Sequence, residues 1–229
     1  DASVGGKTAV DTPLATNLIG LFNQPEKVYL DIETWKTLPE RQLSSGLSET
    51  IKHACLADSE MFRYLENNIE KILVNDKDAC EYIAEHNCAV KYKVVMKDER
   101  ESGLREVLNL GHTVGRAIET VSDYKLLHGE AVSIGLIAQA RLGEKYGYIS
   151  HDNVQRVISL CERAKLPVTI PDYIDKTALV KKLYTDKKVR DGKLRMVFQK
   201  EIGDVMCFGD NDYAKQITEP EIAEVIDEM

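Results

Sequence analysis

From Pro39 onward, apolar residues recur every three to four positions, the spacing of an amphipathic helix. Leu43, Leu47, Ile51 and Cys55 form the first of these apolar stripes. One later segment, 129–146, is apolar on almost every side in its first half, which predicts a buried helix. The pattern predicts helices from 39 to about 55 and over 61–73, 78–97, 104–120, 129–146, 154–164 and 177–183, with a short closing helix around Pro220.

The β signals are few and lie toward the two ends of the chain. Residues 1–38 are rich in Gly, Thr, Pro and Asn, which predicts loop, with one strand at 27–32. A lone strand leaves backbone groups unpaired, so this strand needs partners near the C-terminus or in a sheet outside the chain. Segments 193–198 and 204–208, joined through Ile202-Gly203, predict a β-hairpin. The fold class expected is therefore mainly α with a small β-hairpin.

The composition is that of a globular protein with an excess of acidic groups. The 229 residues are 43% hydrophobic and 30% charged, enough for a buried core, which argues against disorder over the whole chain. A formal net charge of −8 makes nucleic acid an unlikely partner, so an anionic ligand needs a local cluster of Lys and Arg. No apolar run reaches the roughly 18–20 residues that span a bilayer. Five cysteines without a CxxC pair predict reduced thiols and a cytoplasmic location.

Two histidines lie in apolar stretches, where an imidazole without a partner is costly. His112 follows Leu110-Gly111, and His128 lies between Leu127 and Gly129. One interpretation is a pair of core histidines that hydrogen bond to backbone carbonyls. The alternative is a ligand site, and the neighbouring glycines favour it because glycine allows the backbone to approach a ligand closely.

Glu49 is a third polar residue in an apolar setting. On a helix it shares a face with Lys52 and His53, at i+3 and i+4, which is also the spacing of an ordinary surface ion pair. One glutamate and two histidines together would form a zinc site with an open coordination position. We therefore group Glu49 with His112 and His128 as candidate ligands. His53, His86 and His151 are weaker candidates.

Several cations stand beside Gly, Asn or apolar residues, which is unusual for solvated lysines and arginines. Arg105, Asn109, His112 and Arg116 fall at i, i+4, i+7 and i+11, one stripe of a single helix. Such a stripe is suited to binding an anion, although a partly exposed polar face would show the same spacing. The other cations considered are Lys7, Lys52, Lys91, Lys187 and Lys188.

Familiar nucleotide and nucleophile motifs are excluded. Gly5-Gly6-Lys7-Thr8 resembles the end of a phosphate loop, but that motif needs a glycine where Asp1 stands. No GxGxxG fingerprint occurs, and the serines and cysteines lack a nucleophile elbow.

Taken together and in order, the segments of the chain resemble the 3-dehydroquinate synthase family, within the superfamily of sugar phosphate cyclases. The resemblance covers nearly the whole chain and includes residues 1–10, 17–20, 36–39, 98–100 and 186–188. The segments that carry the candidate ligands are Gly46-Leu47-Ser48-Glu49-Thr50-Ile51-Lys52, Leu108-Asn109-Leu110-Gly111-His112-Thr113 and Leu127-His128-Gly129-Glu130-Ala131-Val132.

The resemblance implies a particular domain organisation. The family joins an N-terminal α/β domain that binds NAD to a mostly helical domain that holds metal and substrate. Residues 1–38 are then expected to be a C-terminal remnant of the NAD-binding domain, and residues 39–229 the helical domain. On this expectation the chain is the C-terminal part of a longer protein, inactive alone, and the partners of strand 27–32 precede Asp1. The family is commonly a homodimer.

The resemblance also implies roles for individual residues. Glu49, His112 and His128 match the metal ligands, usually of zinc, with cobalt as a further expectation. The positions that match the catalytic set are Lys7, Lys52, Arg105, Asn109 and Arg116. The positions that match the substrate pocket are Asp1, Lys7, Asn17, Lys52, Lys91, Arg105, Asn109 and one or both of Lys187 and Lys188. The positions that match the NAD contacts are Lys7, Thr16, Thr34, Trp35, Lys36 and Thr37.

The implied reaction converts 3-deoxy-D-arabino-heptulosonate 7-phosphate to 3-dehydroquinate and phosphate, in the shikimate pathway of aromatic amino acid biosynthesis. Two positions depart from the family pattern: Thr16, where the family usually has lysine, and Arg116, where it usually has histidine. Arginine stays protonated and can hold an anion, but it is a poor proton shuttle. Two alternatives remain: a related cyclase of sedoheptulose 7-phosphate or glucose 6-phosphate, and a non-catalytic metal-binding module.

Overall fold

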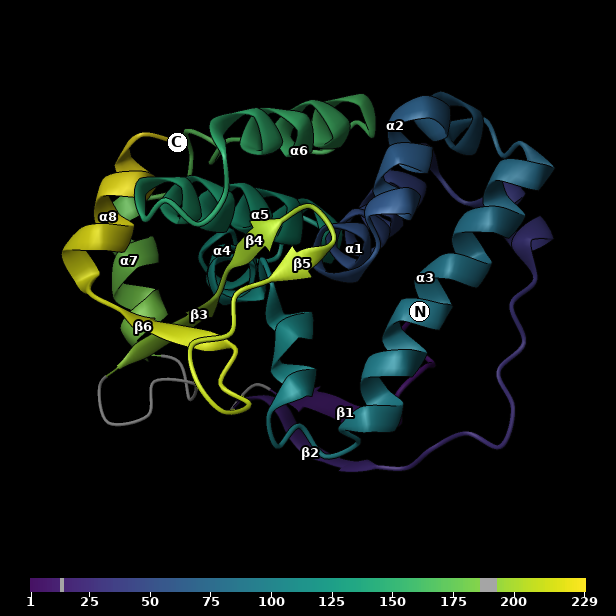
Figure 1. The fold of residues 1–229 in the computed structure, drawn as a ribbon, viewed down its shortest axis with the longest axis horizontal. Coiled ribbons are helices and arrows are strands. Elements are labelled where there is room, and N and C mark those ends of the chain that lie inside the picture. The colour runs from purple at the N-terminus through teal and green to yellow at the C-terminus, as the bar shows by residue number, and fades with distance from the viewer. Residues whose placement is uncertain (13–14, 186–192) are drawn as a thin grey trace.

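The computed structural model describes residues 1–12, 15–185 and 193–229 (Figure 1). Its helices are η1 (Ile32–Thr37), α1 (Glu40–Ala57), α2 (Ser59–Leu73), α3 (Lys77–Lys97), η2 (Leu104–Asn109), α4 (His112–Val121), α5 (His128–Lys145), α6 (His151–Arg163), α7 (Lys176–Thr185) and α8 (Glu219–Asp227). Its strands are β1 (Lys7–Thr12), β2 (Ala15–Phe22), β3 (Leu194–Val197), β4 (Gln199–Glu201), β5 (Asp204–Val205) and β6 (Ala214–Ile217). The fold is mainly α, with small antiparallel sheets.

Helix α5 is the centre of the core. It contacts α1, α4, α6 and α8, and Figure 1 shows α6 running alongside it, with α7 and α8 at the opposite end of the molecule from α3. Ile134, Leu136 and Ile137 on α5 are fully buried, as the apolar sequence of this segment predicts. The first residue of α5 is His128, so packing of this helix against α1 and α4 fixes the position of His128.

Most of the predicted helices are confirmed, but the predicted helix 104–120 is wrong. The chain instead forms η2, turns at Leu110 and begins α4 at His112. Gly111 has φ +77, a left-handed conformation that glycine adopts at little cost. Its N–H donates to the side-chain oxygen of Gln139 on α5, a bond that draws this turn into the core. Arg105 and Asn109 therefore lie on a different element from His112 and Arg116, and the single predicted stripe does not exist.

The predicted strand at 27–32 is also wrong. The strands of this region are β1 and β2, in the stretch predicted as loop, and they pair antiparallel with Val10 opposite Ile19. Two adjacent strands can satisfy each other's backbone groups, whereas residues 27–31 have no strand partner among the described residues. Their side chains Val28, Tyr29 and Leu30 are exposed. Figure 1 shows this extended segment running beside α3 toward η1.

The C-terminal β structure is partly as predicted. β4 and β5 form a hairpin through the turn at Gly203, but β3 pairs with β6 rather than with β5. The N–H of Gly203 donates to the carbonyl of Cys55 at 2.8 Å, so the hairpin is docked on the end of α1. No described helix is long and apolar enough to cross a membrane.

Asp98 orders the loop that joins α3 to η2. Its carboxylate accepts hydrogen bonds from the N–H groups of Ser102, Gly103 and Arg105 at 2.8–2.9 Å and from the Ser102 hydroxyl at 2.9 Å. Burial alone would raise the pKa of Asp98, but these hydrogen bonds outweigh burial and lower it to about 2. The folded state therefore favours the ionised carboxylate.

This lowered pKa predicts an acid-dependent loss of stability. The folded pKa lies below the unfolded one, so the stabilising effect of Asp98 is full above about pH 4 and is lost as pH falls through about 2, a loss of about 2 kcal/mol. The measurement is the free energy of unfolding of wild type and Asp98→Asn as a function of pH. The two curves should be separated at pH 6 and should converge near pH 2. A constant separation across this range would contradict the assignment.

Candidate metal centre and anion pocket

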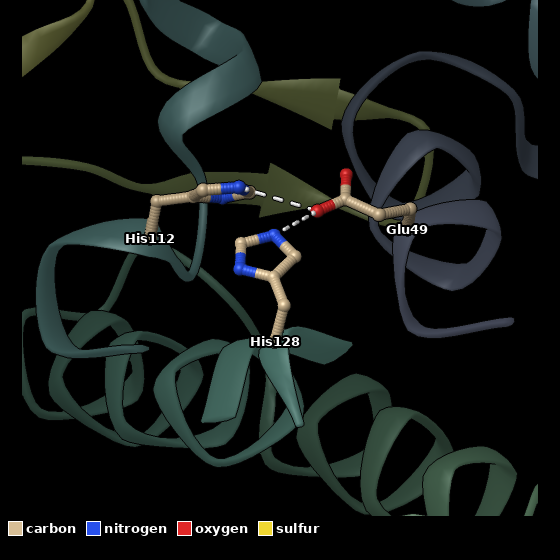
Figure 2. Close-up of side chains that lie close together, drawn as sticks. All are labelled: Glu49, His112 and His128. Carbon is tan, nitrogen blue, oxygen red and sulfur yellow. Dashed lines mark hydrogen bonds and ion pairs between the residues drawn. The ribbon is translucent and has the colours of Figure 1, made fainter. Parts of the chain in front are cut away.

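Three side chains from separate helices converge on one point (Figure 2). Glu49 comes from the middle of α1, and His112 and His128 are the first residues of α4 and α5. The Oε1 atom of Glu49 lies 3.2 Å from His112 Nε2 and 3.1 Å from His128 Nε2. Figure 2 shows both imidazoles directed at this same carboxylate oxygen. The structure thus brings together the three residues that the sequence predicted as ligands.

The other nitrogen of each imidazole is held in place. His112 Nδ1 lies 3.1 Å from the carbonyl oxygen of Leu110, and His128 Nδ1 lies 3.0 Å from Glu119 Oε1. With Nδ1 donating to these acceptors, each Nε2 could present its lone pair to a metal ion bound beside Glu49. A ligating histidine is usually oriented in this way, by a carboxylate or a carbonyl behind it.

The two histidines of the cluster differ in pKa because their surroundings differ. Burial, together with the nearby charge of Lys52, lowers the pKa of His112 to about 4, so this imidazole is neutral at pH 7. Hydrogen bonds with Glu119 and Glu49 raise the pKa of His128 to about 9. Burial would raise the pKa of Glu49, but Lys52, His112 and the hydrogen bonds from both histidines hold it well below its usual value. The cluster therefore contains an ionised carboxylate ready to coordinate a cation.

The donor set fits a zinc ion. The three ligand atoms lie within 4.8 Å of one another, and one carboxylate with two imidazoles is a common set for zinc. The side chains of Glu49 and His112 are only 17% and 10% exposed, whereas His128 is 48% exposed. One side of the cluster therefore faces solvent, which leaves room for a water or substrate oxygen at a fourth position. A metal ion would take the place of the proton on His128, because a ligating imidazole must present a lone pair.

Two lysines with little exposure, the buried Lys52 and the half-buried Lys91, lie near the three candidate ligands. Lys52 Nζ lies 2.5 Å from Glu49 Oε2 and 3.0 Å from the carbonyl oxygen of Leu108. Lys91 Nζ lies 3.0 Å from Asp1 Oδ2 and 2.9 Å from the Asp1 carbonyl oxygen. Burial lowers the pKa of both lysines. These ammonium groups are poorly hydrated, which makes them strong partners for an anion.

Three more predicted pocket residues lie at two places: Lys7 and Asn109 at Glu101, and Arg116 near Lys52 and His112. Lys7 and Asn109 both contact the carboxylate of Glu101, Lys7 through an ion pair and Asn109 Nδ2 through a hydrogen bond of 3.0 Å. Arg116 is half-buried and lies close enough for its charge to lower the pKa values of Lys52 and His112. Arg116 therefore lies near the three candidate ligands, and Lys7 and Asn109 share Glu101 as a partner.

Arg105 differs from this expectation because it is only 2% exposed. Its guanidinium donates to the carbonyl oxygens of Gly5 and Glu99, at 2.7 and 2.5 Å, and its buried Nε has no hydrogen-bond partner among the described residues. In this structure the side chain binds backbone carbonyls of residues 5 and 99 rather than the candidate metal ligands.

Apart from Lys7 on β1, the positions predicted to contact NAD lie on η1 or have side chains outside the described part. Thr34, Lys36 and Thr37 are exposed and Trp35 is half-buried, and Lys36 pairs with Glu33 at 2.6 Å. Thr16 and Asn17 belong to β2, but their side chains are outside the part of the structure that is described, and Lys187 and Lys188 lie wholly outside it. η1 therefore offers at most one edge of a dinucleotide site.

Sequence reasoning missed two residues that organise the cluster. Glu119, which supports His128, stands seven residues after His112 and thus on the same face of α4, a spacing that could have revealed it. Ser45 accepts a hydrogen bond from Gly129 N–H at 3.0 Å through its Oγ, which ties α1 to the start of α5. It stands one turn before Glu49, but a single serine at that spacing carries little information.

Two family models match adjoining parts of the chain. The model described as 3-dehydroquinate synthase C-terminal matches residues 46–189, and the model described as 3-dehydroquinate synthase N-terminal matches residues 1–45. The junction of the two models falls inside α1, whereas the sequence pattern predicted a division at 38/39, before this helix. That division stays a prediction.

Curated relatives share close to half of the sequence. A 3-dehydroquinate synthase of Thermodesulfovibrio yellowstonii is 46% identical over 89% of this chain and 57% of its own length. One of Aliivibrio fischeri is 44% identical over 100% of this chain and 62% of its own length. The chain thus spans about three fifths of the length of these relatives.

Solved structures share the fold. A 2-epi-5-epi-valiolone synthase from Streptomyces hygroscopicus, with NAD+ and Zn2+ bound, is 25% identical with a TM-score of 0.87, over 99% of this chain and 61% of its own. A 2-deoxy-scyllo-inosose synthase complexed with carbaglucose-6-phosphate, NAD+ and Co2+ is 23% identical with a TM-score of 0.90, over 100% of this chain and 63% of its own. The second likeness shows the fold alone.

Proposed function

Since the chain belongs to the 3-dehydroquinate synthase family, we propose that it forms the metal- and substrate-binding part of a 3-dehydroquinate synthase. The proposed reaction converts 3-deoxy-D-arabino-heptulosonate 7-phosphate to 3-dehydroquinate and phosphate. The observation that carries the proposal is the convergence of Glu49, His112 and His128 beside the buried Lys52. Curated relatives of that name at 44–46% identity support the choice of this reaction.

The proposed cofactors are NAD and zinc, with cobalt as a substitute. They are bound in solved structures of the same fold, and the donor set of the cluster suits zinc. When bound, zinc would supply a Lewis acid and a template for substrate oxygens, and NAD would supply reversible oxidation of a hydroxyl group. Thr34, Trp35, Lys36 and Thr37 on η1 are proposed to touch one side of NAD.

The contribution of the chain itself is mainly to position an anionic substrate. The substrate carries a carboxylate and a phosphate, and Lys52 and Lys91 present ammonium groups in a setting with little water. Charges fixed in such a setting stabilise anions more strongly than in water and need no reorganisation during the reaction. We propose that Lys7, Asn109 and Arg116 complete the binding of these two groups. Holding both ends of a flexible substrate lowers the entropic cost of ring closure.

Two further properties belong to the proposal. Five free cysteines, three of them buried, are compatible with a reducing compartment, and we propose a cytoplasmic protein. A homodimer is proposed from the family resemblance.

The test is phosphate release by the whole protein in the presence of NAD and zinc, with the seven-carbon phosphate as substrate. We expect turnover with wild type, a decrease of kcat/KM of at least about 100-fold with Lys52→Met, and wild-type kinetics with Lys181→Met, which changes an exposed lysine of α7.

The other outcomes distinguish the competing functions. Turnover of sedoheptulose 7-phosphate or glucose 6-phosphate, without the seven-carbon acid, would identify a related sugar phosphate cyclase. Zinc binding without turnover of any of these phosphates would leave a non-catalytic metal-binding module.

A further inference from the structure

We propose that Asp98 is a positioning residue of the anion pocket, because it orders a loop that locks Arg105 against the β1–β2 hairpin. We call the contacts of Arg105 with the hairpin region the lock. The lock sets the positions of Asp1 and Lys7 relative to Glu49, His112 and His128. The effect expected on turnover rests on the proposed function, whereas the effect on the hairpin does not.

The first step is the loop itself. Asp98 ends α3, and its two carboxylate oxygens accept four hydrogen bonds from the next seven residues, two at each oxygen. The side chain is only 8% exposed. Four bonds to one carboxylate fix the path of residues 99–104, which would otherwise be a loop of small and charged residues.

The second step is the guanidinium that the loop presents. Asp98 accepts from the N–H of Arg105, and the Arg105 side chain turns back to donate to the carbonyl of Glu99 within the same loop. The other end of the guanidinium donates to the carbonyl of Gly5 at 2.7 Å and lies 5.5 Å from the centre of the Phe22 ring. Arg105 therefore joins the loop to Gly5, just before β1, and to Phe22, the last residue of β2.

The junction at Gly5 is closely packed. A Cβ atom at Gly5 would lie 2.7 Å from Arg105 Nη2, so a side chain here would displace the guanidinium, and the φ of +103 is one that other residues rarely adopt. Two more contacts join the same loop to the hairpin region: Gln24 Nε2 donates to Glu99 Oε1 at 3.0 Å, and Lys7 pairs with Glu101. Every one of these bonds depends on the path of the loop that Asp98 fixes.

The third step is the connection from Gly5 through Asp1 to the candidate metal ligands. Asp1 lies one turn before Gly5, in a turn closed by a bond of 2.9 Å from Val4 N–H to the Asp1 carbonyl. Asp1 also pairs with Lys91, and its carboxylate lies within 4.8 Å of donor atoms of Glu49 and His53. A shift of Gly5 therefore moves Asp1 on one side and Lys7 on the other.

The test compares Asp98→Asn with two controls in the 229-residue chain. Asp98→Asn keeps the shape but turns an NH2 group toward backbone donors. Ser102→Ala removes only one of the four bonds. Asp76→Asn changes the carboxylate at the other end of α3, which accepts one bond, from Ala79 N–H. The measurement is hydrogen–deuterium exchange of the backbone amides of residues 5–12 and of α5.

We expect hairpin amides to exchange about 10-fold faster in Asp98→Asn, less so in Ser102→Ala, and at the wild-type rate in Asp76→Asn. Amides of α5, which report global unfolding, should change only as far as the measured free energy of unfolding changes. In the whole enzyme we expect KM to rise by about 10- to 100-fold in Asp98→Asn with zinc content unchanged. Unchanged hairpin exchange in both Asp98→Asn and Ser102→Ala, or an unchanged KM, would overturn the proposal. If wild type shows no turnover, the proposed function fails, and the exchange experiment alone decides whether the lock exists.

Discussion

Replacing Gly129 with alanine is expected to lower the free energy of unfolding by about 3 kcal/mol, the upper part of the range for overpacking. A Cβ atom at this position would lie 1.8 Å from the carbonyl oxygen of Ser45 and 2.6 Å from its carbonyl carbon. These are backbone atoms of α1, so no change of rotamer relieves the clash. The helices α1 and α5 must separate, and Glu49 must then move away from His128. Chemical denaturation measures the first effect and zinc affinity the second.

Gly46→Ala is the matched control on the other side of this contact. Gly46 lies on α1, one residue after Ser45, and no heavy atom outside its own helix lies within 4 Å of the position of a Cβ. Alanine is the better helix former, so this variant should gain about 0.5–1 kcal/mol and bind zinc as wild type does. If Gly129→Ala and Gly46→Ala change stability alike, close packing of α1 on α5 does not set the geometry of the cluster.

The helical part of the fold could be predicted because its signal is local. The apolar stripes of α1 and α2 follow from residues within each helix, and burial of α5 follows from its almost wholly apolar first half. The candidate ligands were found for a related reason: Glu49, His112 and His128 are polar residues in apolar surroundings, where a side chain without a partner would destabilise the fold.

The break before α4 could not be predicted because its cause is distant in sequence. Glycine can occur within a helix at a modest cost, so Gly111 alone does not indicate a turn. The turn depends on Gln139, 28 residues later, whose side chain accepts from Gly111 N–H and donates to the carbonyl of Val197. A buried glutamine on an otherwise apolar helix indicates that its side chain forms hydrogen bonds, but the sequence does not identify the partners.

The role of Arg105 depends on a contact that is even more distant. Helical spacing placed Arg105 on the same face as His112, and that spacing assumed one continuous helix. The structure instead joins Arg105 to the carbonyl of Gly5, 100 residues earlier. Pairing of β1 with β2 has a similar origin, since the two segments are stabilised as strands by each other and by their attachment to this arginine.

His128→Ala is the second variant for which a large effect is expected. Loss of an outer partner of a metal ligand already costs about 10- to 100-fold in affinity, and loss of a ligand itself should cost more. His151→Ala is the control, because His151 is an exposed histidine that pairs with Glu144 at the protein surface. Both variants should fold, since His128 is 48% exposed and leaves no large cavity.

Zinc content per chain, measured by mass spectrometry after dialysis against a weak chelator, tests the central claim most directly. That claim is that Glu49, His112 and His128 together hold one metal ion. We expect about one zinc per chain in wild type and in His151→Ala, and close to none in His128→Ala. One zinc per chain in a folded His128→Ala variant would contradict the claim.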